Sequence, residues 1–118
     1  QREINYEALS KKEYIVTLDD HDISVRIEDG NLFIVKTFKN YSTSILEGDK
    51  LVREADLANS ILTCGHIHTK FKEDSKLYLV YKSVLYFHGG ITADHLFLFF
   101  ICCEKNIDLV SNVLGEKK

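Results

Sequence analysis

The chain has 118 residues, of which 45% are hydrophobic and 28% are charged, and its formal net charge is −3. This length and composition are typical of one globular domain with a single core, which we expect to span residues 1–118. No apolar run approaches the roughly 20 residues that cross a bilayer, and the acidic balance provides no basic field for nucleic acid. We therefore expect neither a membrane span nor a nucleic-acid partner.

The three cysteines, two of them adjacent at Cys102 and Cys103, do not suit a paired disulfide framework. Free thiols fit a reducing compartment, so we expect a cytoplasmic protein. Since the chain starts at Gln1 and contains no methionine, we expect that the initiator has been removed or that the natural chain begins upstream.

The N-terminal segment over residues 4–12 is predicted to form a short helix. Tyr6 and Leu9 lie three residues apart, which places them on one helical face. The segment is short for an independent helix, so we expect it to fray or to pack as a remnant.

Three strands are predicted next. Apolar residues alternate with polar ones over residues 14–18 and again over residues 23–27. Asp29 and Gly30 then give a strong turn signal before a third run over residues 32–38. This order predicts a three-stranded antiparallel meander.

The middle of the chain is predicted to be a loop followed by a helix and a strand. Residues 39–48 are polar, and Asp49 is a plausible N-cap for the helix. Gly65 is expected to end that helix, and residues 66–72 begin another extended segment. The helix has an apolar stripe made by Leu51, Val52, Ala55, Ala58, Ile61 and Leu62.

A long strand then leads into the last helix. Residues 77–87 alternate with both faces largely apolar, which is typical of a central strand. Gly89 and Gly90 allow backbone angles that other residues disfavour, and Thr92 is placed to cap a new helix.

The apolar run over residues 96–103 is compatible with a strand or a helix. We favour a helix, because apolar residues keep recurring every three or four positions as far as Leu114. The run carries more apolar surface than one buried face needs, and an exposed apolar patch usually marks a protein contact. The predicted contact residues are Tyr86, Phe97, Leu98 and Ile101.

An alternative function is a small metal-binding or redox protein centred on Cys64, His66 and His68. Residues two apart on a strand share a face, and thiolate with imidazole suits zinc. A fourth ligand is not evident in the sequence, and the histidines also suit a half-exposed strand. We therefore expect no cofactor, and we find no motif that places a nucleophile or paired carboxylates for catalysis.

Two segments resemble the YbjN family, described as bacterial sensory-transduction regulators, and more distantly the class I type III secretion chaperones. The first is the strand over residues 77–85 with the Gly-Gly-Ile-Thr sequence of residues 89–92 and Leu96. The second is the helix over residues 57–62, which has Asn59 at a recurrent asparagine position. Taken together, the resemblance covers residues 14–114.

This resemblance implies an α+β domain with a type III secretion chaperone-like fold. The expected order is a short N-terminal helix, a three-stranded antiparallel meander, a helix, two further strands and a C-terminal helix. It also implies a protein without enzyme activity that commonly dimerises. We therefore expect a non-catalytic, cytoplasmic homodimer of chaperone or regulatory type that binds a protein client or partner segment.

Overall fold

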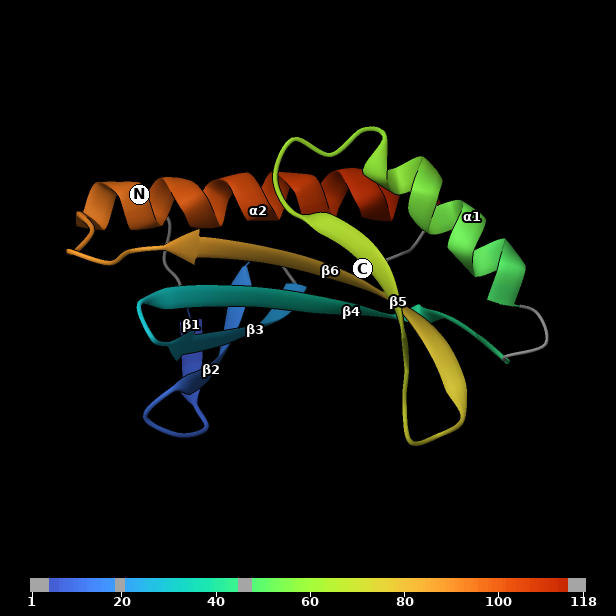
Figure 1. Cartoon of the computed structure of the whole chain (residues 1–118), viewed down its shortest axis with the longest axis horizontal. Helices are drawn as coiled ribbons and strands as arrows, with labels where there is room; N and C mark the ends of the chain where they lie inside the picture. The colour runs from blue at the N-terminus through green and yellow to red at the C-terminus, as the bar shows by residue number, and fades with distance from the viewer. Residues whose placement is uncertain (1–4, 19–20, 45–47, 115–118) are drawn as a thin grey trace.

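The computed structural model describes residues 5–18, 21–44 and 48–114 (Figure 1). Within these ranges a six-stranded antiparallel sheet has the strand order β1-β2-β3-β4-β6-β5, and two helices pack on one of its faces. The elements are β1 (Asn5–Ala8), β2 (Glu13–Leu18), β3 (His21–Glu28), β4 (Asn31–Ser44), α1 (Gly48–Asn59), β5 (His66–Phe71), β6 (Lys76–Tyr86) and α2 (Ala93–Leu114).

The two longest strands, β4 and β6, pair in the interior of the sheet. Their register runs from Asn31 opposite Tyr86 to Phe38 opposite Leu79, and it resumes beyond an irregularity in β4. Because side chains alternate along a strand, this pairing decides which residues of β6 face the helices. Leu79 and Tyr81 face them and are completely buried. The central strand predicted over residues 77–87 is therefore confirmed.

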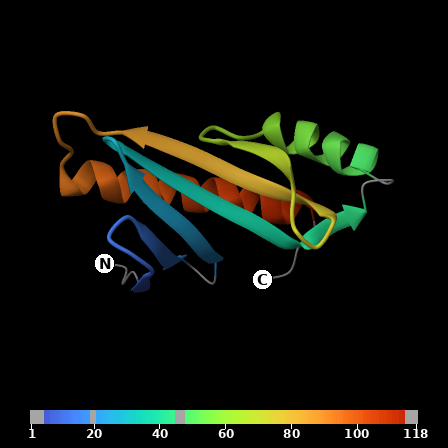
Figure 2. The same cartoon turned by 60° about the horizontal axis from the view of Figure 1, so that its bottom comes forward.

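The core lies between the helix-covered face of the sheet and the two helices (Figure 2). Burying each large apolar side chain of this kind contributes about 1.5–3 kcal/mol. The sheet supplies Ile23, Ile34, Phe38, Leu79 and Tyr81, α1 supplies Leu51, Ala55 and Ala58, and α2 supplies Cys103, Ile107 and Val110.

The predicted turn at Asp29-Gly30 and the predicted Thr92 cap are both present, whereas Asp49 lies in the first turn of α1, which begins at Gly48, and is not its N-cap. Asp29 and Gly30 have φ angles of 50° and 76°, which is the signature of a two-residue hairpin turn, here joining β3 to β4. At the start of α2 the backbone N–H of His95 donates to the Thr92 hydroxyl over 3.1 Å. The prediction of a helix rather than a strand over residues 96–103 is confirmed.

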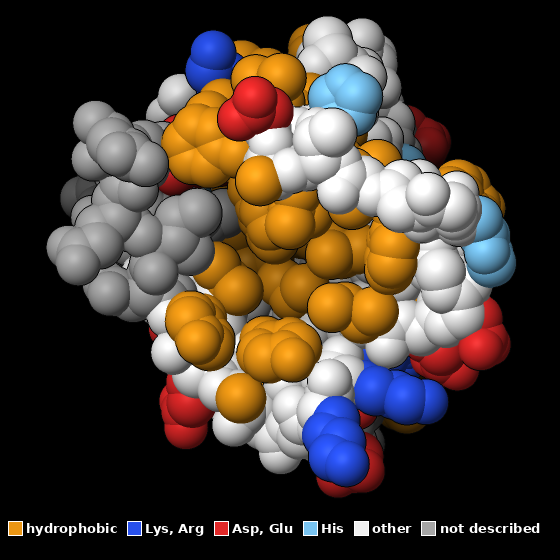
Figure 3. Space-filling model, turned by 90° about the vertical axis from the view of Figure 1, so that its left-hand side faces the viewer, with side chains coloured by type: hydrophobic (Ala, Val, Ile, Leu, Met, Phe, Trp, Pro, Cys, Tyr) orange, Lys and Arg blue, Asp and Glu red, His pale blue; other side chains and the backbone are white. Residues whose placement is uncertain are grey.

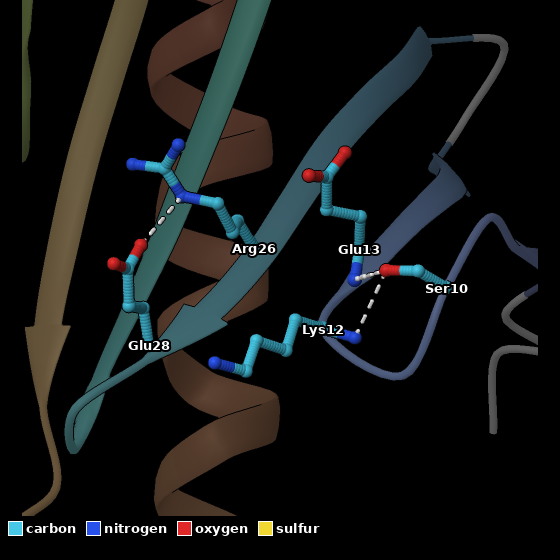
Figure 4. A network of polar contacts seen from close by, with 5 residues as sticks. All are labelled: Ser10, Lys12, Glu13, Arg26 and Glu28. Carbon is cyan, nitrogen blue, oxygen red and sulfur yellow. Dashed lines mark hydrogen bonds and ion pairs between the residues drawn. The ribbon is translucent and has the colours of Figure 1, made fainter.

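The predicted N-terminal helix is wrong, and with it the predicted order of elements. In the described part of the segment, residues 5–8 form β1, which pairs with β2. The Ser10 hydroxyl stabilises the connecting turn by accepting hydrogen bonds from the backbone N–H groups of Lys12 and Glu13, each over 3.1 Å (Figure 4). Tyr6 is 70% exposed in β1, so the segment is held mainly by the hydrogen bonds of its backbone to β2 and not by burial of this side chain.

Two predicted boundaries are also wrong. Residues 39–44 continue β4 instead of forming a loop, because their backbone extends the pairing with β6 as far as Lys76. Helix α1 ends at Asn59, before the predicted stop at Gly65. The Asn59 side chain accepts the backbone N–H of Ile67 over 2.6 Å and donates to its carbonyl over 2.9 Å. These two hydrogen bonds tie the end of α1 to β5, and the chain turns toward β5 instead of continuing the helix.

Replacing Asn59 with alanine is expected to lower the free energy of unfolding by about 2 kcal/mol, because the backbone N–H and C=O groups of the buried Ile67 both lose their hydrogen bonds to this side chain. Ser60→Ala is the matched control, since the neighbouring Ser60 hydroxyl makes only an exposed bond to Leu57. It should change stability by no more than about 0.5 kcal/mol. Urea unfolding of the two variants measures both effects, and equal losses would contradict this role of Asn59.

Candidate protein-binding surface

Helix α2 is enclosed over its second half only. Its buried residues are Cys103, Glu104, Asn106, Ile107, Val110 and Ser111. None of residues 93–102 is buried, although residues 96–101 are six consecutive large apolar side chains. Figures 1 and 2 show the first turns of this helix extending past the end of β6. A helix that is apolar on all sides is normally surrounded by protein, and this one is not.

The exposed apolar residues of α2 follow its outward side. The exposed Leu98, Leu109 and Val113 and the partly exposed Ile101 recur at multiples of three or four positions, and the exposed Lys105 lies between the two pairs. We call the set Phe97, Leu98, Ile101, Leu109 and Val113 the α2 stripe. The sequence prediction included its first three members. It missed Leu109 and Val113, which continue the spacing of Ile101 beyond Lys105.

Apolar side chains also gather at the end of the molecule where α2 begins and β6 ends. Figure 3 faces this end and shows them at its centre, with charged side chains mainly toward the rim. Leu96, Phe99 and Phe100 are only partly buried where they pack against the core. An apolar centre with a polar rim is the usual build of a protein contact surface.

Tyr86 does not join the α2 stripe. It is the last residue of β6 and is exposed. The preceding Leu85 packs against the core, so alternation turns Tyr86 to the opposite face of the sheet, which we call the open face. The four predicted contact residues therefore lie on two surfaces.

The open face carries a shallow groove of about 210 Å³. The Phe33 ring lines it, with the Arg26 guanidinium 5.0 Å and the Lys82 ammonium 5.4 Å from the ring centroid. Val80 is buried there although no helix of the described chain covers this face. Arg26 also pairs with Glu28 over 3.4 Å (Figure 4), but both groups are about half exposed, so the pair contributes little.

His68 lines the same groove. Its Nδ1 atom is buried and has no hydrogen-bond partner. Desolvation and the neighbouring charges of His66, Lys82 and Lys70 lower the pKa of His68 below its usual value of 6.5. The site therefore favours the neutral imidazole.

The residues of the alternative metal site are divided between the two faces of the sheet. The Cys64 thiol lies 3.4 Å from the hydroxyl of Ser83, which faces the helices. His66 instead pairs with Lys82, and both it and His68 are on the open face. Within the described ranges, no three or more histidine, cysteine or acidic side chains are placed to hold a metal ion.

Comparisons with known proteins identify the fold. No family model matches the chain, and no curated protein matches it in sequence. A solved structure does match: that of YbjN from E. coli, described as a candidate transcription regulator. The TM-score is 0.73 at 14% sequence identity, and the match covers 95% of this chain and 84% of that one.

The chain therefore has the YbjN fold, as its sequence resemblance implied. At 14% identity the match shows the fold alone. Among the described residues, neither helix has the length and apolar character needed to cross a membrane.

Acid is expected to destabilise the protein partly through His68. Its pKa is lowered in the folded state, so below about pH 6.5 the unfolded chain binds the proton more readily and stability falls. His68→Gln should reduce the loss in free energy of unfolding between pH 7 and pH 5. Lys82→Gln, which removes one opposing charge, should act in the same direction. Urea titrations at both pH values measure the loss, and an unchanged loss in His68→Gln would contradict this origin.

Proposed function

We propose that this protein is a non-catalytic, protein-binding domain of regulatory type that forms a homodimer through the α2 stripe. The observation that carries the proposal is the incomplete enclosure of α2, in which none of six consecutive large apolar residues is fully buried and two of them, Phe97 and Leu98, are exposed. An apolar surface of this kind gains free energy when another protein covers it.

A second copy of the chain fits this surface. Helix α2 has 22 residues and is about 33 Å long, so its stripe offers an extended seam for helix packing. In a two-fold dimer each copy presents the same surface, so an apolar stripe meets another apolar stripe. A net charge of only −3 adds little repulsion between the copies.

The regulatory part of the proposal is supported by the match to YbjN, since that protein is described as a candidate transcription regulator. The cytoplasm is the proposed location, because Cys64, Cys102 and Cys103 are all free thiols. A chaperone role has support only from the sequence resemblance to secretion chaperones.

The dimer is tested by placing a charge in the α2 stripe. Leu98→Glu should weaken self-association at least 100-fold, because a carboxylate would be buried in the interface without a partner. Leu57→Glu is the matched control, since Leu57 on α1 and Leu98 on α2 are both 60% exposed. Sedimentation equilibrium should give twice the chain mass of 13.6 kDa for the wild type and for Leu57→Glu. Leu98→Glu should sediment as a monomer.

Two results would contradict the proposal. One is a wild-type protein that remains a monomer up to millimolar concentration. The other is a dimer that Leu98→Glu leaves intact, which would place the interface elsewhere. Circular dichroism of each variant confirms that the fold is retained, since both leucines lie at the surface.

A further inference from the structure

Two thiols that are distant in the sequence meet beside the sheet. The Sγ atoms of Cys64 and Cys103 are 4.0 Å apart, although 39 positions separate them along the chain. Cys64 lies in the connection between α1 and β5 and is partly exposed. Cys103 lies on α2 and is completely buried.

The connection that carries Cys64 is fixed from several sides. The Tyr81 hydroxyl donates to the Cys64 carbonyl over 2.7 Å, and the Asn106 carbonyl oxygen accepts the backbone N–H of Thr63 over 2.9 Å. Gly65 has a φ of +78°, and a Cβ atom there would lie 2.6 Å from the Tyr81 hydroxyl. The backbone of Cys64 is therefore held in place opposite Cys103.

The sulfur atoms need to approach by about 2 Å to reach the 2.05 Å of a disulfide. Rotation about the Cα–Cβ bond of Cys64, whose sulfur contacts Ser83 and the Cys103 thiol, is the movement that we expect to bring the two atoms together.

The two thiols differ in reactivity. Partial burial opposes ionisation of Cys64, but hydrogen bonds, above all with Ser83, outweigh it and lower the pKa of that thiol. Burial, with the charge of the Cys64 thiolate, raises the pKa of Cys103 to about 12. Oxidation starts at a thiolate that the oxidant can reach, so Cys64 reacts first.

We propose that Cys64 and Cys103 are a peroxide-sensitive pair that closes to an intramolecular disulfide. The Cys64 thiolate attacks one oxygen of hydrogen peroxide, the O–O bond breaks, and the leaving hydroxide takes up a proton to give water. The Cys103 sulfur then attacks the Cys64 sulfenic acid and forms the S–S bond. The hydroxyl leaves as a second water with the Cys103 proton, so two thiols are oxidised and one peroxide is reduced.

The partly exposed Cys102 is the natural control, because it lies next to Cys103 in the chain. Its sulfur is engaged by the Asn106 amide at 3.7 Å, and burial with the Cys64 interaction raises its pKa. We assign Cys103 as the resolving thiol on its sulfur–sulfur distance.

The test treats the reduced, folded protein with hydrogen peroxide and follows thiol alkylation by intact mass. The wild type should fall from three alkylatable thiols to one while remaining a single chain, and dithiothreitol should restore all three. Cys102→Ala should still lose two thiols. Cys103→Ala should form no disulfide, and dimedone should trap its Cys64 sulfenic acid.

Three results would overturn the proposal. In one, the folded wild type keeps three thiols at peroxide concentrations that oxidise the urea-unfolded chain. In another, Cys102→Ala abolishes the disulfide, which would assign the bond to Cys102. In the third, Cys64→Ala, a change at a partly exposed position, still permits oxidation of Cys103. This last variant keeps the test decisive if Cys103→Ala fails to fold.

Discussion

The pairing of β4 with β6 is the constraint on which the rest of the structure depends. It runs the length of both strands and fixes which side chains of β6 point to the helices and which to the open face. Leu79 and Tyr81 thereby enter the core, whereas Lys82 and Val80 line the groove. The same register sets the end of β6, from which the chain turns through two glycines with positive φ into α2. A slip by one residue would exchange the two faces and expose the core of the strand.

Local signals in the sequence were sufficient for much of this architecture. The Asp29-Gly30 turn, the Thr92 cap and the persistence of helical spacing to Leu114 each depend on neighbouring residues, and each is present. The strand over residues 5–8 depends instead on a partner strand, and its helical spacing was misleading. The alternation of side chains over residues 77–87 predicted β6. It did not predict that β4 extends far enough to pair with the first residues of β6.

The candidate surfaces show the same division. The surplus of apolar residues at the start of α2 was evident in the sequence, because a single buried face does not need six of them in a row. The strand register alone shows that Tyr86 lies on another surface than these α2 residues. Cys64 and Cys103 are 39 positions apart in the sequence, and they meet because Asn106 and Tyr81 hydrogen-bond to the segment that carries Cys64. No local sequence pattern predicts a contact between residues so far apart in the chain.

Helix α2 thus combines a buried half that completes the core with an unburied half that the fold alone does not satisfy. Hydrogen–deuterium exchange measured at increasing protein concentration tests this account most directly, because burial in an interface protects amides in proportion to the dimer present. We expect the protection of residues 93–102 to rise with protein concentration, and the protection of α1 to stay unchanged. The contradicting result is a protein that sediments as a monomer at every concentration measured and in which the exchange of residues 93–102 does not change with concentration.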